Sequence, residues 1–138
     1  MKQYIGTKLV EAEPQQKDGR EGYRVRYAGG YESWSPKEAF EMAYLALTVN
    51  EELRTEKPSI SAKMVKEFIK EKEVITMGDK TTVVRAVLRN GFEIVEASSC
   101  VSPENYDEDL GAKICMERIE GKVWMLLGFL LQTAVGGI

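Results

Sequence analysis

Histidine is absent from the 138 residues of this chain. Its absence excludes Ser-His-Asp and Cys-His catalysis, histidine zinc sites and the most common general base. Only two cysteines are present, Cys100 and Cys115, and two such thiols are more often buried small side chains of a reducing compartment than a disulfide. These absences do not exclude an enzyme but make one less expected, and the sequence predicts neither a metal site nor a cofactor.

Long apolar runs and an excess of positive charge are also missing. The longest apolar run, residues 123–131, is far below the roughly 20 residues that span a bilayer, and no signal-peptide pattern opens the chain. The formal net charge is −3, which disfavours general binding to nucleic acid or to membrane surfaces. The sequence thus predicts a cytoplasmic protein with no membrane partner and no nucleic-acid partner.

What remains is an ordinary globular composition, with 43% hydrophobic and 30% charged residues. The charged segment 51–58, EELRTEKP, has the character of a linker. It divides the chain into a predicted N-terminal module, residues 1–57, with a β-hairpin and a helix, and a predicted core, residues 58–138. The core should contain a helix, an antiparallel β-hairpin and one long helix.

In the N-terminal module, residues 3–12 read as a strand and the polar residues 13–21 as a loop. Alternating apolar and basic residues at 23–27, a glycine turn and the segment 31–34 predict a hairpin. The apolar face of this hairpin is expected to cover the following helix. The alternative, in which the two arginines of the strand 23–27 meet a ligand, is less favoured.

Two helices should follow. Ser35 can cap the free N–H groups of the first, and Pro36 suits its first turn, so we expect a helix from there to about Asn50. A second apolar stripe predicts a helix over residues 60–71. A short strand, residues 74–77, then leads into the main hairpin.

The main hairpin is predicted from Asn90-Gly91, a two-residue turn between alternating apolar runs. This turn places Arg85 opposite Glu96, on one face with Phe92. The face is either an ion pair with an edge aromatic or a site for a flat anionic ligand, because arginine binds phosphate and aromatic rings stack on bases. The other face, with Val84, Ala86 and Leu88, should meet a helix.

The long C-terminal helix, capped by Ser102 or Asn105, ends in the apolar run 123–131. A helix that is apolar all round must be covered, and Gly121 and Gly128 on one face suggest close approach of another backbone. A second copy of the chain is the favoured cover, and the N-terminal helices of the same chain are the alternative. The predicted fold class is α+β, with small antiparallel hairpins packed on helices and the long C-terminal helix forming a homo-oligomer interface.

Three segments of the core, GDKTTVV, RNGFEIVEASSCVSPENYD and LGAKICMERIEGKVWMLLGFLLQ, resemble a widespread family of small phage and prophage proteins, over residues 60–132. The N-terminal GYESWSPKEAFEMAYL is similar to a module of other phage proteins. The core also resembles the first described type of Thoeris anti-defence protein.

This resemblance implies a non-catalytic sponge that holds glycocyclic ADP-ribose (gcADPR), the signal of TIR-domain defence proteins, in the infected host. It also implies homo-oligomers built on dimers, with hexamers that bind cyclic di- or trinucleotides at separate sites.

The candidate ligand-binding residues follow from the chemistry of the ligand. Phosphate, ribose and adenine are bound by the side chains of arginine, lysine and asparagine and by aromatic rings. The candidates are Arg85, Asn90, Phe92, Asn105, Tyr106, Arg118 and Lys122.

Each candidate also has a structural interpretation. In the structural interpretation, Asn90 is a turn residue and Asn105 is a helix cap. Arg118 lies among apolar positions of the predicted helix, and it needs an anionic partner if it is buried. The alternative function is a protein-interaction module that inhibits a host protein through the hairpin of Tyr31 and Trp34 or through an exposed helix face. The acidic balance argues against a third function, a phage accessory protein for nucleic acid.

Overall fold

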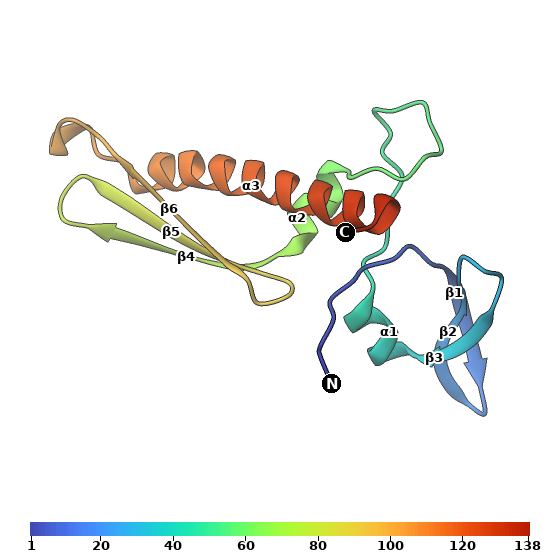
Figure 1. Ribbon diagram of the computed structural model, residues 1–138. Helices are drawn as coiled ribbons and strands as arrows, with labels where there is room; N and C mark the ends of the chain where they lie inside the picture. Colours follow the sequence, from blue (N-terminus) through green and yellow to red (C-terminus); the bar gives the residue numbers. More distant parts are fainter. The chain divides into compact units, whose positions relative to one another are not determined.

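A computed structural model describes residues 1–138 and confirms the α+β fold class (Figure 1). Two antiparallel sheets, ordered β1-β2-β3 and β4-β5-β6, are present. The chain packs as two units, residues 1–47 with 130–138 and residues 48–129, and each is described by itself. The elements are β1 (Glu11–Lys17), β2 (Arg20–Arg26), β3 (Glu32–Pro36), α1 (Lys37–Ala43), α2 (Ala62–Phe68), β4 (Ile69–Met77), β5 (Thr81–Leu88), β6 (Glu93–Ser99), the 3-10 turn η1 (Pro103–Asn105) and α3 (Glu108–Gly136).

The start of the first sheet differs from the prediction. Residues 1–10 form no strand, and the predicted loop 13–21 instead contains most of β1 and the beginning of β2. The turn between these strands is Asp18-Gly19, in which both residues have positive φ, as a two-residue hairpin turn requires. Every residue of β1 is exposed, so the strand carries no apolar alternation that a sequence pattern could show.

The predicted hairpin of β2 and β3 is confirmed, and its apolar face packs on the following helix as expected. Val25 is buried, and the Tyr23 ring stacks on Phe40 with centroids 4.3 Å apart. The Phe40 ring stacks in turn on Tyr44, at 4.8 Å. This aromatic column ties helix α1 to the first sheet.

Helix α1 is shorter than predicted, and its predicted cap is wrong. Ser35 belongs to β3, where it pairs with Tyr23, and Pro36 takes the N-cap position without a side-chain hydrogen bond. The helix ends at Ala43 rather than near Asn50. Ser35, which the predicted cap requires, is paired within the sheet instead. No residue of α1 is buried, so core packing does not stabilise a longer helix.

The second unit begins with α2, which confirms the predicted helix with shorter bounds. The Ser61 hydroxyl accepts the Met64 N–H at 3.2 Å, and Met64, Val65 and Phe68 are buried. The predicted residues 69–71 join β4 instead, since Ile69 already pairs with Leu88.

The register of the β5–β6 hairpin is one residue away from the prediction. Arg85 lies opposite Val95, not Glu96. The Leu88 N–H donates to the Phe92 carbonyl at 2.8 Å, and Gly91 is the loop residue with positive φ. The loop therefore has three residues, a turn followed by a left-handed glycine, rather than the predicted two.

A slip of one residue moves the side chains of a strand to the opposite face of the sheet. Ile94 and Glu96 consequently share the α3 side with Val84, Ala86 and Leu88, and the predicted ion pair between Arg85 and Glu96 does not form. The β5 half of the predicted helix-facing surface is correct, and its β6 half is wrong.

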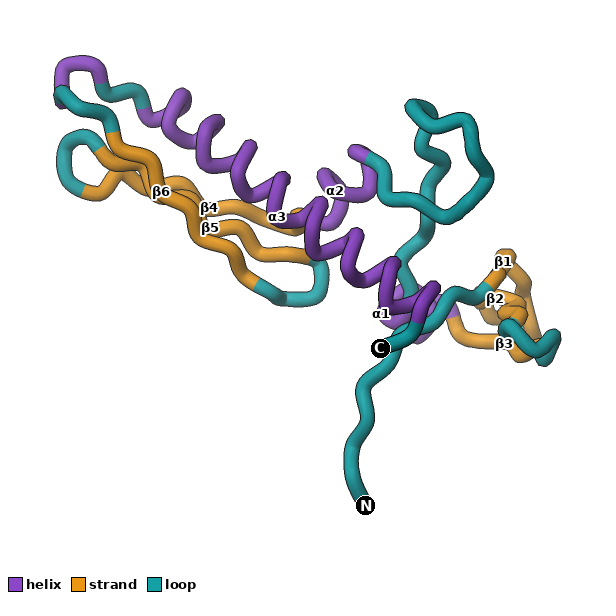
Figure 2. The backbone as a smooth tube through the Cα atoms, turned by 45° about the horizontal axis from the view of Figure 1, so that its top comes forward, coloured by secondary structure: helices purple, strands orange, loops and turns teal.

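Helix α3 lies along the sheet β4-β5-β6 (Figures 1 and 2). Its buried residues recur every fourth position and form one stripe: Cys115, Ile119, Val123 and Leu127. An added Cβ at Gly111 would lie 2.1 Å from the Thr82 hydroxyl, so close packing within the unit needs this glycine. Gly121 and Gly128, for which close approach was predicted, have no neighbour of that kind in the chain. None of the helices combines the length and the apolar character needed to cross a membrane.

Candidate functional site

All seven predicted ligand-binding residues lie in the second unit, but at three separate places. The first place is the outer sheet face with the β5–β6 turn, the second is the η1 connection, and the third is the side of α3 that faces β6. The residues are Arg85, Asn90 and Phe92 at the first, Asn105 and Tyr106 at the second, and Arg118 and Lys122 at the third.

At the turn, Asn90 has a structural role, whereas the side chain of Phe92 is exposed to solvent. The Asn90 side chain accepts the Phe92 N–H at 3.1 Å, which holds the turn and confirms the structural interpretation of Asn90. The Phe92 side chain is 58% exposed. Arg85 forms an ion pair with Glu93, its neighbour across the strands, on the sheet face away from α3. This place therefore offers an exposed ring and a neutralised arginine.

At the η1 connection, Tyr106 fastens the chain to the end of the sheet. Its hydroxyl bonds to the Thr76 and Thr82 hydroxyls, at 2.7 and 2.8 Å, and Thr82 is fully buried. The predicted caps of the long helix are wrong, because Asp107 accepts the Leu110 N–H at 3.1 Å. The Asn105 N–H donates to the Ser102 carbonyl inside η1.

The third place is a pair of cations that we call the basic flank, Arg118 and Lys122. They lie four residues apart on α3 and therefore on one side of the helix. Arg118 donates to the Ala97 carbonyl at 2.9 Å, and Lys122 lies 2.5 Å from the carboxylate of Glu96, which is largely shielded from solvent. Arg118 is exposed, so it does not need the anionic partner that was expected for a buried arginine.

A single chain does not gather these places into one pocket. The turn at Phe92 and the connection at Tyr106 lie at opposite ends of β5, roughly 20 Å apart at 3.3 Å per residue. Arg85 and the basic flank lie on opposite faces of the sheet. A ligand that touches both Phe92 and Tyr106, or both Arg85 and the basic flank, therefore needs a second chain.

A groove between β4 and α3 was not predicted. It has a volume of about 580 Å³, and four carboxylates and two lysines surround an apolar floor. Carboxylates exceed lysines, so the groove disfavours a phosphate. The sequence signal that could have indicated the groove is the spacing of its α3 residues, which recur every three or four positions. The lining residues are Lys72, Val74, Glu108, Asp109, Ala112, Lys113, Met116, Glu117 and Glu120. No group of three metal-binding side chains occurs in the structure.

Residues 60–135, from just before α2 through almost all of α3, match a family of phage proteins. The match covers more than half of the chain. The chain belongs to the phage protein (N4 Gp49/phage Sf6 gene 66) family. The predicted resemblance to a phage family is thereby confirmed. No curated protein and no solved structure matches the chain.

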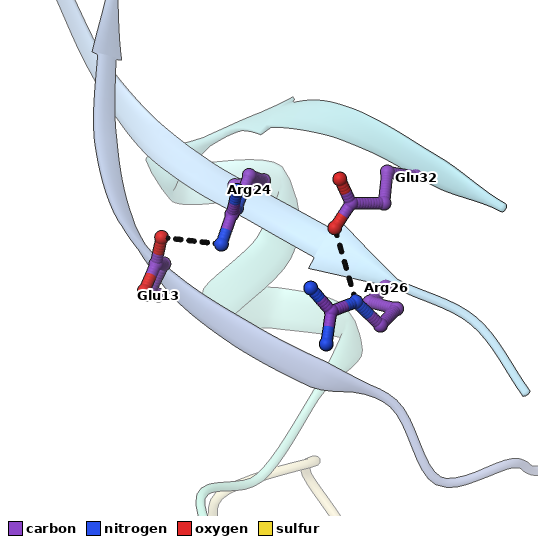
Figure 3. Close-up of polar contacts among 4 residues, drawn as sticks. All are labelled: Glu13, Arg24, Arg26 and Glu32. Carbon is purple, nitrogen blue, oxygen red and sulfur yellow. Dashed lines mark hydrogen bonds and ion pairs between the residues drawn. The ribbon is translucent and has the colours of Figure 1, made fainter. Parts of the chain in front are cut away.

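The first sheet, β1-β2-β3, precedes the region that matches the phage family. Its exposed sheet face carries the two arginines for which a ligand was the less favoured interpretation. Figure 3 shows both in ion pairs with sheet glutamates: Arg24 with Glu13 at 2.8 Å and Arg26 with Glu32 at 3.1 Å. Neighbouring strands thus supply the counter-charge for each arginine.

Proposed function

We propose that this member of the phage family is an anti-defence sponge. It binds and sequesters glycocyclic ADP-ribose in the cytoplasm of the infected host, without catalysis, and so keeps the Thoeris effector inactive. Two things support the proposal: the membership of the phage family, and the resemblance of the core segments to the first type of Thoeris anti-defence protein. Cyclic dinucleotides are the second ligand class of the proposal.

The basic flank is the structural observation that carries the proposal. A guanidinium has five N–H donors, and the Ala97 carbonyl uses one donor of Arg118. The others can form a bidentate contact with a phosphate, and Lys122 adds a second charge one helical turn away. In the proposed complex a phosphate competes with Glu96 for Lys122. Phe92, from a second copy, supplies the ring on which adenine stacks.

A site between two copies follows from the separation of the candidates. The proposed assembly is a dimer through α3, which the resembling proteins extend to a hexamer as a trimer of dimers. Two α3 side chains support this surface, because Met125 is 67% exposed and Phe129 is 74% exposed. Exposed apolar groups four residues apart on one helix are typical of a protein contact.

Calorimetry with glycocyclic ADP-ribose, cyclic dinucleotides and cyclic trinucleotides tests the function. Arg118→Ala and Phe92→Ala should each weaken binding at least about tenfold, since a charge-assisted contact or a stacked base contributes roughly 1–3 kcal/mol. Arg24→Ala, an ion-paired arginine of the first unit, is the matched control and should bind normally. Ligand recovered intact from denatured protein indicates a sponge, whereas cleaved ligand indicates an enzyme.

A protein-interaction module that inhibits a host protein is the second candidate. Tyr31, at the β2–β3 turn, is exposed and stacks on Tyr27 in the sheet that precedes the family match. Co-purification of a host protein that Tyr31→Ala abolishes, without binding of any nucleotide in the panel, would favour this function over the sponge.

A further inference from the structure

Residues 1–10 form an extended arm without a helix or strand (Figure 2). Within it, Tyr4 is 91% exposed and Ile5 is 87% exposed. The arm also contains Thr7, Leu9 and Val10, so its central part is rich in residues that favour strands. No strand of its own chain pairs with it. The arm thus has the composition of a strand and lacks the partner that a strand requires.

The second sheet has two edge strands, β4 and β6, and one carbonyl of the β6 edge is already bonded to a side chain. At the β6 edge, Arg118 occupies the Ala97 carbonyl, at 2.9 Å. At the other edge β4, a strand of nine residues, pairs only with β5. Unpaired N–H and C=O groups along such an edge are a template for another strand. The groove between β4 and α3, with the Val74 side chain in its floor, runs beside this open edge.

The arm is basic, and the outer face of β4 is acidic. The arm carries Lys2 and Lys8 and no acidic residue. On β4, Glu71 and Glu73 are exposed on the outer face and alternate with Lys70 and Lys72, so β4 is neutral as a whole and only its outer face is acidic. Opposite charges on the arm and on this face favour the pairing of the two strands and oppose the pairing of β4 with another acidic edge.

An antiparallel arrangement fits both faces at once. With Tyr4 opposite Ile75, Lys8 lies opposite Glu71 on the outer face. Ile5 then lies opposite Val74, on the side of the groove. The alternation of a strand therefore places Lys8 beside Glu71 and the apolar Ile5 on the apolar floor, while Gly6 lies opposite Glu73 and Lys2 opposite Met77.

We propose that residues 3–9 of one chain add as an antiparallel strand to the open edge of β4 in a second copy. The arm exchange uses different residues from the α3 contact of the proposed sponge, and it needs no nucleotide. Its failure and the failure of the sponge are therefore separate results.

Disulfide trapping between two differently tagged chains tests the exchange. One chain carries Tyr4→Cys and the other Ile75→Cys, both in a Cys100→Ser background in which Cys115 stays buried. Oxidation should give a mixed-tag disulfide dimer. The matched control replaces Ile75→Cys by Val74→Cys, which lies on the opposite face and should cross-link at least about tenfold less.

A second pair of variants tests the strand itself. Thr7→Pro removes a backbone N–H that the added strand would donate, and should lower the mixed-dimer yield about tenfold, whereas Thr7→Ala should leave it unchanged. Since Thr7 is exposed and outside every helix and strand, neither variant disturbs the fold. Equal yields with Ile75→Cys and Val74→Cys, or a disulfide that forms only inside one chain, would overturn the proposal.

Discussion

Replacing Gly111 by alanine should destabilise the second unit, although alanine is the better helix former. The new Cβ would lie 2.1 Å from the Thr82 hydroxyl oxygen and 2.7 Å from the Thr82 Cβ, whereas real contacts rarely come below 3.0 Å. Thr82 cannot easily withdraw, because it is fully buried and its hydroxyl bonds to Tyr106 at 2.8 Å. Either α3 lifts from the sheet or this hydrogen bond breaks.

The opposing effects on the free energy of unfolding can be compared. Alanine gains about 1 kcal/mol of helix propensity over glycine. Overpacking costs roughly 1–3 kcal/mol, and loss of the Tyr106 hydrogen bond costs about 1 kcal/mol more. The net expectation is a destabilisation of about 1–3 kcal/mol, seen in urea unfolding as a lower midpoint with an unchanged slope.

A double-mutant cycle separates the clash from other effects of Gly111→Ala. Thr82→Ala removes the atoms that the new methyl group meets, so the two substitutions together should cost less than the sum of each alone. Full additivity, or a Gly111→Ala protein as stable as the parent, would refute the packing of α3 on β5 at Gly111.

Two further predictions concern titrating side chains. A thiol reagent should modify Cys100 first and Cys115 only after denaturation, because burial raises the pKa of the Cys115 thiol and hides it; equal rates would contradict this. The Glu41 carboxylate, which accepts the Tyr23 hydroxyl at 2.8 Å, raises the pKa of Tyr23. The protonated phenol is the form favoured by folding, so this contribution to stability is present below the ordinary pKa of tyrosine and is lost as pH rises through the raised value. Glu41→Gln should lower the pKa of Tyr23 in an ultraviolet titration, and an unchanged value would contradict the role of Glu41.

The hairpin of β5 and β6 shows how far the sequence could be read. Asn90-Gly91 predicted the turn at the correct place, but not its length. A two-residue turn needs positive φ at both positions, and only Gly91 adopts it. The observed register buries Ile94, which the predicted register would have placed on the outer face. Core packing therefore decided the register, and the choice of turn followed.

The other wrong predictions concern segments whose place in the fold differs from the one that their sequence indicates. Ser35 has the side chain of a helix cap, but in the structure it lies in β3 and pairs with Tyr23. Strand β1 was missed because all its residues are exposed and no alternation marks it, although Asp18-Gly19 was a readable turn signal.

The candidate site was predictable as a set of residue types, not as a location. The chemistry of phosphate and adenine selected arginine and phenylalanine, and the structure leaves the side chains of Arg118 and Phe92 exposed. The sequence could not show that Arg85 and Arg118 lie on opposite faces, because that depends on register and on the packing of α3. The groove beside β4 was missed since its residues are, one by one, ordinary surface side chains.

Calorimetric titration of the full chain with glycocyclic ADP-ribose tests the central claim most directly. The sponge predicts saturable binding, an at least about tenfold loss in Arg118→Ala but not in Arg24→Ala, and recovery of intact ligand from denatured protein. Absence of binding to glycocyclic ADP-ribose and to every cyclic nucleotide in the panel would contradict it.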